Sequence, residues 1–280
     1  MTCGILGTGF VGEAITNKFQ KEFNVETFDI KKHSSCKSLK ELFDKCEFIF
    51  ICLPTPMKED GSCDLSNVHN SLYQLNKFSD NIKSKKIVVI KSTIPVGSTK
   101  KFQKKFKSLD IFFSPEFLTE ANHIKDFENQ NRIIIGGRNK NKYKLINLFS
   151  RIFPNTEIID TDSSTAEMVK YFANTFLATK VSFANEMFDF CAKLNIDYNK
   201  VVDYVLYDKR IGPSHLSVPG ADNKRGYSGS CFPKDMASLI NQFEEHNVQT
   251  YILKASWRRN NEIDRVEKDW EKLKGRSVVD

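Results

Sequence analysis

The feature that most constrains this chain is a glycine-rich turn near its N-terminus, Gly7-Thr8-Gly9-Phe10-Val11-Gly12. A short extended run (residues 2–6) precedes it, and a helical pattern follows. The spacing predicts a tight turn at Gly7, close backbone approach to a pyrophosphate at Gly9, and close packing of the helix on a strand at Gly12. The turn therefore predicts a dinucleotide site in an α/β fold.

A second extended run (residues 25–30) contains Asp29, which lies about 20 residues after the glycine turn, where a ribose-binding acid is expected. A carboxylate at this position binds ribose hydroxyls and repels a 2′-phosphate. Asp29 therefore predicts NAD rather than NADP as the cofactor.

The first part of the chain alternates short apolar runs with helical patterns. These runs are nearly continuous in apolar residues, as strands buried on both faces of a parallel sheet are. They cover residues 48–52, 87–90, 111–113, 133–135 and 157–159. The pattern predicts a doubly wound α/β domain over residues 1–162, a Rossmann-like fold with a parallel sheet.

The second part of the chain, residues 163–274, has a helical character. We expect a long helix over residues 165–194, capped by Ser164 or Thr165, and a shorter helix over residues 200–207. An irregular loop follows over residues 208–231, and helices then dominate over residues 233–274, with an interruption near Asn247. The apolar faces of these helices predict an all-α domain that forms a homodimer.

Composition excludes several classes of protein. No apolar run approaches the roughly 18 residues of a membrane span, so no membrane partner is expected. The seven cysteines have neither metal-ligand nor disulfide-framework spacing, which predicts no metal site and reduced thiols in the cytoplasm. The net charge is +7. Lysine clusters at 83–86 and 100–105 lack a nucleic-acid-binding module, so we interpret them as solvated faces and expect no nucleic acid partner. An anionic small substrate fits the charge equally well.

A cysteine near the C-terminal end stands in the run Gly226-Tyr227-Ser228-Gly229-Ser230-Cys231-Phe232-Pro233-Lys234-Asp235. Pro233 suits the start of a helix, and a thiol beside a helix N-terminus and a lysine loses its proton more readily. The alternative is that Cys231 is an inert small hydrophobe, as many free cysteines are. Together with a nicotinamide cofactor, a reactive Cys231 predicts oxidation to an acyl-thioester, followed by hydrolysis.

Several longer motifs occur in order along the chain. They are the glycine turn, Leu53-Pro54-Thr55-Pro56, Lys91-Ser92-Thr93-Ile94-Pro95-Val96-Gly97, Ser114-Pro115-Glu116-Phe117-Leu118-Thr119-Glu120, Lys170 with Asn174, Arg210-Ile211-Gly212-Pro213 and the cysteine run. With these motifs the chain resembles the UDP-glucose 6-dehydrogenases within the UDP-glucose/GDP-mannose dehydrogenase family. The resemblance implies a four-electron oxidation of the sugar C6 alcohol by two NAD molecules, through a thiohemiacetal and a thioester on Cys231.

The resemblance also implies roles for charged residues that the sequence alone would leave as solvated pairs. Lys170 and Asn174 are four residues apart and would share one helix face. By resemblance, Lys170 stabilises oxyanions and Asn174 holds the sugar or a catalytic water. Glu116 becomes the base for thioester hydrolysis, and Glu120 a contact where cofactor and substrate meet. Asp235 orders a water network with Lys170 and Thr93.

The remaining site residues are also implied by the resemblance. The cofactor-binding set adds Phe10, Val11, Pro54, Thr55, Pro56, Ser92, Thr93 and Lys234 to the glycine turn, Asp29 and Glu120. The substrate-binding set comprises Glu116, Phe117, Leu118, Glu120, Lys170, Asn174, Arg210, Gly226, Tyr227 and Ser228. Arg210 reaches the substrate of a partner subunit in the family, which again implies a dimer.

Two departures from the family leave the function open. The stretch Asn223-Lys224-Arg225 is more basic than expected beside the sugar, and residues 275–280 look like the first strand of a further, uridine-binding domain. We expect that domain to be absent from this chain, either because the gene is naturally short, or because another chain supplies the domain, or because the sequence is a fragment. Three functions remain: oxidation of UDP-glucose, oxidation of another nucleotide sugar such as GDP-mannose or a UDP-N-acetylhexosamine, and an NAD-binding subunit without independent activity.

Overall fold

The computed structural model describes residues 1–79 and 85–280, so Lys83 and Ser84 of the first lysine cluster lie outside the described residues. The chain folds as two compact units. Unit 1 comprises residues 1–55 and 65–170, and unit 2 comprises residues 56–64 and 171–280.

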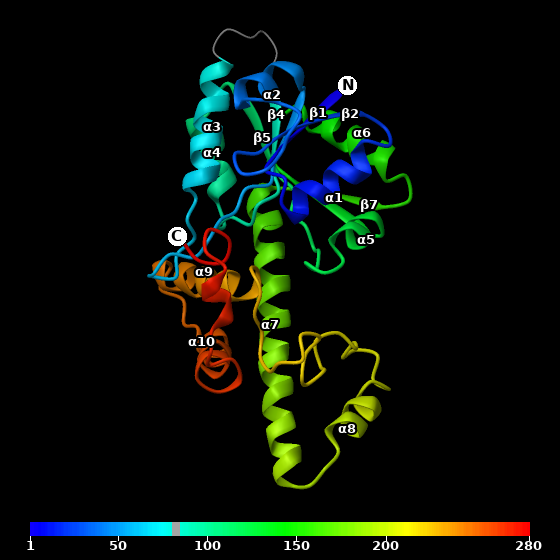
Figure 1. The fold of residues 1–280 in the computed structure, drawn as a ribbon, viewed down its shortest axis with the longest axis vertical. Coiled ribbons are helices and arrows are strands. Elements are labelled where there is room, and N and C mark those ends of the chain that lie inside the picture. The colour runs from blue at the N-terminus through cyan, green and yellow to red at the C-terminus, as the bar shows by residue number, and fades with distance from the viewer. Residues whose placement is uncertain (80–84) are drawn as a thin grey trace. The chain divides into compact units, whose positions relative to one another are not determined.

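Unit 1 is built on a seven-stranded sheet with the strand order β2-β1-β3-β4-β5-β6-β7 (Figure 1). The strands are β1 (Thr2–Leu6), β2 (Asn24–Phe28), β3 (Phe48–Ile51), β4 (Lys86–Ile90), β5 (Leu109–Phe113), β6 (Arg132–Gly136) and β7 (Glu157–Thr161). The predicted α/β fold is confirmed, with each predicted apolar run in a strand.

The strand direction reverses once in the sheet, between β5 and β6. All other neighbouring strands pair in parallel, but β5 and β6 pair antiparallel at Phe113 and Gly136. The expectation of a parallel sheet is therefore wrong for this pair. An antiparallel neighbour needs no crossover to the opposite edge of the sheet. Consequently residues 114–131, which link β5 to β6, begin and end at the edge where β5 ends.

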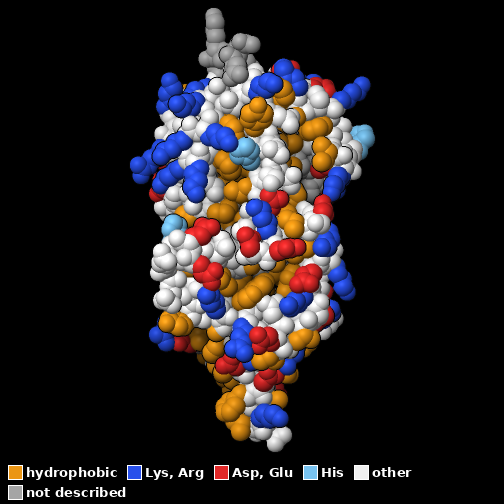
Figure 2. All heavy atoms as spheres, turned by 90° about the vertical axis from the view of Figure 1, so that its left-hand side faces the viewer, with side chains coloured by type: hydrophobic (Ala, Val, Ile, Leu, Met, Phe, Trp, Pro, Cys, Tyr) orange, Lys and Arg blue, Asp and Glu red, His pale blue; other side chains and the backbone are white. Residues whose placement is uncertain are grey.

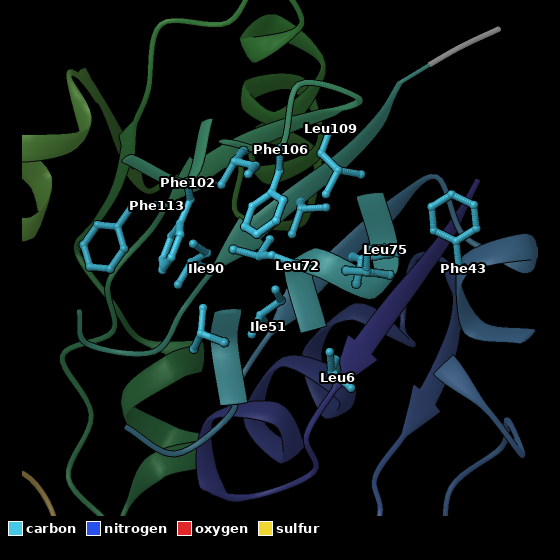
Figure 3. Close-up of a cluster of buried hydrophobic side chains, with 14 of the residues drawn as sticks. Leu6, Phe43, Ile51, Leu72, Leu75, Ile90, Phe102, Phe106, Leu109 and Phe113 are labelled. Carbon is cyan, nitrogen blue, oxygen red and sulfur yellow. The ribbon is translucent and has the colours of Figure 1, made fainter. Parts of the chain in front are cut away.

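Helices cover both faces of the sheet in unit 1 (Figure 1). They are α1 (Phe10–Phe19), α2 (Leu39–Lys45), α3 (Ser66–Phe78), α4 (Ser98–Lys105), α5 (His123–Glu128) and α6 (Lys142–Ile152). Alternate residues of a strand point to opposite faces. Ile49 and Ile51 accordingly pack in the cluster that contains side chains of α2, α3 and α4, shown in Figure 3. Phe48 and Phe50 pack in the cluster that contains side chains of α1, α5 and α6.

The long helix α7 (Ser163–Lys193) lies close to its predicted bounds. Its cap differs from the prediction of Ser164 or Thr165. The Asp162 carboxylate accepts hydrogen bonds from the backbone N–H of Ser164 at 3.0 Å and from that of Thr165 at 3.4 Å. A carboxylate one residue before the helix satisfies two of its unpaired amides, so Asp162 is the cap.

Unit 2 is helical. After α7 it contains α8 (Tyr198–Val205), α9 (Phe232–Glu245), α10 (Tyr251–Arg259), a π-helical turn η1 (Asn260–Asp264) and a 3₁₀ turn η2 (Asp269–Lys272). The predicted interruption near Asn247 falls between α9 and α10, where Asn247 adopts a left-handed φ of 55°. Beyond Arg259 the expectation that helices dominate up to residue 274 holds only in part, because two short turns, η1 and η2, replace α-helix there.

Two surface features bear on possible partners. None of the helices within residues 1–79 and 85–280 combines the length and apolar character required to cross a membrane. Lys and Arg side chains gather on the upper part of the face in Figure 2, where α3 and α4 lie. Helix α4 contributes Lys100, Lys101, Lys104 and Lys105.

Candidate active site

In unit 1 the predicted site residues follow the ends of neighbouring strands. The glycine turn follows β1, Asp29 follows β2, Thr55 comes shortly after β3, Thr93 after β4 and Glu116 after β5. These five strands are parallel, so they end at one edge of the sheet. Ligands of open α/β sheets bind outside the carboxyl ends of the strands.

The glycine turn has the geometry that a pyrophosphate requires. Gly7 has a φ of 91°, which favours glycine, and a Cβ atom on Gly12 would lie 2.0 Å from the Gly7 carbonyl oxygen. A Cβ atom on Gly9 would meet nothing within 4 Å, so space lies open before the backbone there. Gly9 is also the N-cap residue of α1. An open glycine at a helix N-terminus fits the phosphates of NAD.

Asp29 is held at the neighbouring strand end. Its carboxylate accepts hydrogen bonds from the Thr8 backbone N–H at 2.8 Å, the Thr8 hydroxyl at 3.1 Å and the Lys31 backbone N–H at 2.7 Å. Burial alone would raise the pKa of Asp29, but these hydrogen bonds lower it below its ordinary value. The anionic form suits a ribose and disfavours a 2′-phosphate.

The segments after β3 and β4 are tied together. The Thr55 hydroxyl donates to the Thr93 carbonyl oxygen at 2.7 Å, and the Ser92 hydroxyl donates to the Leu53 carbonyl oxygen at 2.5 Å. Pro54 lies exposed in the same segment, whereas Pro56 belongs to unit 2. Thr55, Ser92 and Thr93 are thus brought together at the edge of the sheet in unit 1.

Glu116 is buried beside a lysine that the sequence analysis did not single out for a role. Its carboxylate forms an ion pair with Lys91, and both side chains are at most 5% exposed. The Lys91 ammonium also donates to the Ser114 hydroxyl at 3.0 Å. Burial raises the pKa of Glu116 above its ordinary value, although the cations of Lys91 and Lys170 oppose that shift.

Lys170 lies next to Glu116. Its ammonium donates a hydrogen bond to the Glu116 carbonyl oxygen and lies 5.3 Å from the centre of the Phe117 ring. Phe117 and Leu118 are half-buried and pack against the core clusters. Glu120 is half-buried, and its carbonyl oxygen lies 2.9 Å from a ring nitrogen of His123. The structure therefore brings Lys170, Glu116 and Phe117 together in unit 1.

A second residue without an assigned role, Glu167, fixes the loop that follows Thr93. This fully buried carboxylate accepts hydrogen bonds from Gly97 N–H at 2.6 Å, Thr99 N–H at 2.8 Å and the Thr99 hydroxyl at 2.6 Å. It satisfies the N-terminal amides of α4, whose N-cap residue Gly97 has no side chain.

In unit 2, Cys231 is the N-cap residue of α9, and Pro233 lies in the first turn of that helix. The thiol is half-buried, with its sulfur 3.8 Å from the Ser230 hydroxyl. The N-terminal amides of a helix favour a negative charge at this position. The half-buried sulfur is therefore partly accessible at the start of α9.

Asp235 joins two other predicted site residues in unit 2. Its carboxylate, 1% exposed, accepts hydrogen bonds from the Asn174 amide and from the Lys234 ammonium, both at 2.6 Å. Burial alone would lower the pKa of Lys234, but the negative charge of Asp235 raises it above its ordinary value. Lys234 thus carries its charge beside Asp235.

The other predicted substrate residues of unit 2 lie on loops. Arg210 is exposed and forms an ion pair with Asp208 of its own loop. Gly226, Tyr227 and Ser228 lie in the irregular segment before Cys231, and Tyr227 is buried. The side chain of Asn260, further along the chain, forms two hydrogen bonds with the backbone of this segment.

The basic residues that depart from the family pattern are paired within unit 2. Lys224 pairs with Asp269 at 3.0 Å, and Arg225 pairs with Asp189 and Asp264, each at 2.8 Å. Their charges are neutralised by neighbouring carboxylates. The basic stretch therefore does not by itself indicate a different substrate. Within residues 1–79 and 85–280, no group of three or more His, Cys, Asp or Glu side chains could hold a metal ion.

Comparisons with known proteins identify the family of the two domains. Residues 26–156 match the NAD-binding domain of the UDP-glucose/GDP-mannose dehydrogenase family, and residues 164–262 match the central domain of the same family. The first match confirms the predicted cofactor, NAD.

Individual similar proteins are named UDP-glucose dehydrogenases. The chain is 36% identical over 231 residues to the UDP-glucose 6-dehydrogenase of Rickettsia felis, covering 79% of this chain and 50% of that protein. It is 36% identical over 248 residues to the enzyme of Pseudomonas aeruginosa, covering 84% of this chain and 53% of that protein. The chain thus spans about half the length of these curated relatives. A solved UDP-glucose dehydrogenase from Pyrobaculum islandicum superposes with a TM-score of 0.84 at 27% identity, covering 93% of this chain and 68% of that one.

Proposed function

Since this chain belongs to the UDP-glucose/GDP-mannose dehydrogenase family, we propose that it oxidises the C6 alcohol of a nucleotide sugar, UDP-glucose, to the uronic acid. The observation that carries the proposal is the half-buried thiol of Cys231 at the N-terminus of α9, four residues before an Asp235 that bonds Asn174 and Lys234. A thiol nucleophile serves oxidation beyond the aldehyde, because its adduct with the aldehyde can lose a second hydride.

The NAD site lies on the glycine turn and Asp29 of unit 1. NAD, when bound there, would supply the hydride acceptor for both oxidations. The amides at the start of α1 would bind the pyrophosphate, and Asp29 would bind the ribose hydroxyls. Thr55, Ser92 and Thr93 would support the cofactor from the adjacent strand ends, where Thr55 donates to Thr93 and Ser92 donates to Leu53.

Cys231 performs the covalent step in the proposed mechanism. Its thiolate adds to the C6 carbon of the aldehyde, which forms a C–S bond and a thiohemiacetal. The second oxidation removes a hydride and a proton and leaves a thioester. Water then adds to the thioester carbon, the C–S bond breaks, and the carboxylic acid leaves while the thiolate is restored.

Glu116 and Lys170 supply the proton transfer and the charge stabilisation. A general base works best when its pKa lies close to the operating pH, and burial moves the pKa of Glu116 upward in that direction. Glu116 would accept a proton from the attacking water, and the ammonium of Lys170 would stabilise the developing oxyanions. Asn174, held by Asp235, would hold the sugar hydroxyl or the water.

The test is turnover by the purified protein with NAD and UDP-glucose. We expect two NADH for each uronic acid released. Cys231→Ser should reduce formation of the acid by at least about a thousandfold, because the covalent step is lost, and should leave the Kd for NAD unchanged. Cys191→Ser, a buried cysteine of unit 2, is the matched control and should retain activity.

Other outcomes would contradict parts of this proposal. Free acid formed by Cys231→Ser at the wild-type rate would exclude the thioester. Turnover with GDP-mannose or a UDP-N-acetylhexosamine in place of UDP-glucose would assign another nucleotide sugar. No turnover with any of them, while NAD still binds, would favour a subunit that needs a partner chain.

We further propose that the protein is a homodimer through one face of α7. Phe172, Phe176, Phe183 and Phe190 are each 59–63% exposed on this helix. Their spacing of four and seven residues places them on one face. Phe172 and Phe176 stack with ring centres 6.2 Å apart. Light scattering should give twice the chain mass, and Phe183→Asp should give the mass of one chain; a monomeric wild-type protein would exclude the dimer.

A further inference from the structure

The segment that presents Cys231 has no regular structure of its own. Residues 222–230 form turns and bends between a loop and the start of α9. Backbone amides and carbonyls that leave water need partners, and this segment has no ladder to supply them. What holds these residues therefore decides where the thiol of Cys231 stands.

Asn260 pairs with the backbone of this segment. Its amide oxygen accepts a hydrogen bond from the Tyr227 N–H at 2.8 Å, and its amide nitrogen donates to the Tyr227 carbonyl oxygen at 3.1 Å. Asn260 is fully buried, so neither group can exchange its partner for bulk water. The Asn260 amide thus bonds both backbone groups of Tyr227, as a neighbouring strand would in a sheet. Tyr227 lies four positions before Cys231.

Gly226 allows this approach. It has a φ of 67°, and a Cβ atom at this position would lie 2.4 Å from the Asn260 side-chain oxygen. Any larger residue would be strained and would collide with Asn260. The glycine and the asparagine are therefore matched to each other.

Arg265 and Asp269 hold the same segment on either side of Tyr227. The Arg265 guanidinium donates to the Arg225 carbonyl oxygen at 3.0 Å and to the Asp222 carboxylate at 2.5 Å. Asp269 accepts hydrogen bonds from Arg265 and from the Ser228 hydroxyl. The Arg265 side chain is 3% exposed, so its guanidinium is shielded from water, whereas its partner Asp222 is half exposed.

The local helix geometry explains how one short segment makes all these contacts. Residues 260–264 form a π-helical turn, which is wider than an α-helical turn and is frequent at functional sites. Asn260 begins this turn and Asp264 ends it, and both side chains bond residues 225–227. The side chains at the first and last positions of the turn thus both contact the segment before Cys231.

We propose that residues 260–269 act as a template that fixes the cysteine segment, with Asn260 as a positioning residue for the thiol of Cys231. The proposal deepens the function proposed above and rests on it. Asn260 acts through the backbone of Tyr227. Its loss should misplace the nucleophile while unit 1, which binds NAD, is unaffected.

The experiment compares Asn260→Ala with Asn261→Ala. Asn261 is the adjacent residue, and its amide donates a single bond to the Trp257 carbonyl within the helix. We expect Asn260→Ala to lower kcat by about a hundredfold, the scale for a displaced catalytic group, with the Kd for NAD within about twofold of wild type. Hydrogen exchange of the peptide that contains Tyr227, and alkylation of Cys231 by iodoacetamide, should both become faster. Asn261→Ala should change none of these.

The exchange and alkylation measurements need no turnover, so the two proposals fail separately. An inactive wild-type protein whose Tyr227 exchange depends on Asn260 would remove the proposed dehydrogenase function and support the template. Unchanged exchange and alkylation in Asn260→Ala would overturn the template even in an active enzyme. If Asn260→Ala does not fold, Asp269→Asn, which weakens the bond to Ser228, should give the same changes at smaller size; wild-type behaviour in that variant would also overturn the template.

Discussion

The two groups of proposed site residues are held in different ways. In unit 1, Glu116 is buried at the end of a strand, and an ion pair with Lys91 fixes it. In unit 2, Cys231 is half-buried at a helix N-terminus, and the segment before it is fixed by side chains about thirty residues further along the chain. The sheet positions one group through the register of its strands, whereas a buried amide positions the other.

The difference matches what each group would do. A general base benefits from a shifted pKa, and burial at the sheet edge raises the pKa of Glu116. A nucleophile must reach the substrate, and a loop that ends at the N-terminus of α9 leaves Cys231 half-buried and accessible. Glu116 is therefore held in place by burial at the sheet edge, whereas the segment before Cys231 is held by the side chains of residues 260–269.

The largest expected effect on this comparison is the loss of thioester hydrolysis when Glu116 is replaced. Glu116→Gln keeps the shape of the side chain but removes the base, so we expect hydrolysis of the thioester to slow by about 10²–10⁴-fold. Single-turnover assays that separate the two NADH steps from release of the acid would measure it. Hydride transfer should be less affected.

Glu128→Gln is the control for that change. Glu128 lies on α5 in the same unit and forms only a surface ion pair with Lys21. We expect wild-type rates. If Glu116→Gln released the acid as fast as wild type, the buried carboxyl would be a structural group, and the contrast between a buried base and an accessible nucleophile would be lost.

A smaller effect concerns the rigidity of unit 1. Glu167→Ala would leave the half-buried amide of Gly97 and the buried amide of Thr99 without their acceptor. We expect the free energy of unfolding to fall by about 3 kcal/mol, since each hydrogen bond to a charged group contributes roughly 1.5–3 kcal/mol and part of that is offset by the cost of burying the carboxylate. Urea denaturation would measure the loss.

Glu186→Ala on the same helix is the matched control, because the Glu186 side chain is 62% exposed. Its unfolding free energy should stay within about 0.5 kcal/mol of wild type. An equally stable Glu167→Ala protein would mean that the loop after β4 is held by the sheet alone.

The sequence predicted the features that depend on local pattern. The strand runs, the glycine turn and the long helix follow from apolar periodicity and from the conformational needs of residues such as Gly7. The motifs with which the chain resembles its family then pointed to NAD, now confirmed by the domain match. The roles proposed for individual side chains remain predictions.

The features that the sequence did not reveal depend on contacts between distant residues. Glu167 lies about 70 residues from the loop that it fixes, and Asn260 lies 33 residues from Tyr227. Neither residue shows a local signal, because a buried glutamate and a surface glutamate on α7 look alike in sequence. The antiparallel pairing of β5 and β6 was missed for the same reason, since strand direction is set by the path of the connection.

The smallest expected effect is the pH dependence of stability at Glu116, and it tests whether burial or the ion pair decides the charge of this carboxyl. Burial raises the pKa of Glu116 above its ordinary value of 4.5. The folded protein then retains this proton at pH values where the unfolded chain has lost it. The contribution of Glu116 to stability is full below pH 4.5 and is lost as pH rises through the folded pKa.

Glu116→Gln imitates the protonated carboxyl at every pH. Urea denaturation from pH 4 to pH 8 should therefore show the variant gaining stability relative to wild type as pH rises. Glu128→Gln should show the opposite change, a loss of stability relative to wild type as pH rises. The hydrogen bond from Lys21 lowers the pKa of Glu128, so the small contribution of Glu128 to stability is lost as pH falls. If the Glu116→Gln difference instead moved in the direction of the Glu128→Gln difference, Lys91 would outweigh burial. Glu116 would then be an ordinary ionised partner of a buried lysine, and its contrast with Cys231 would be one of exposure alone.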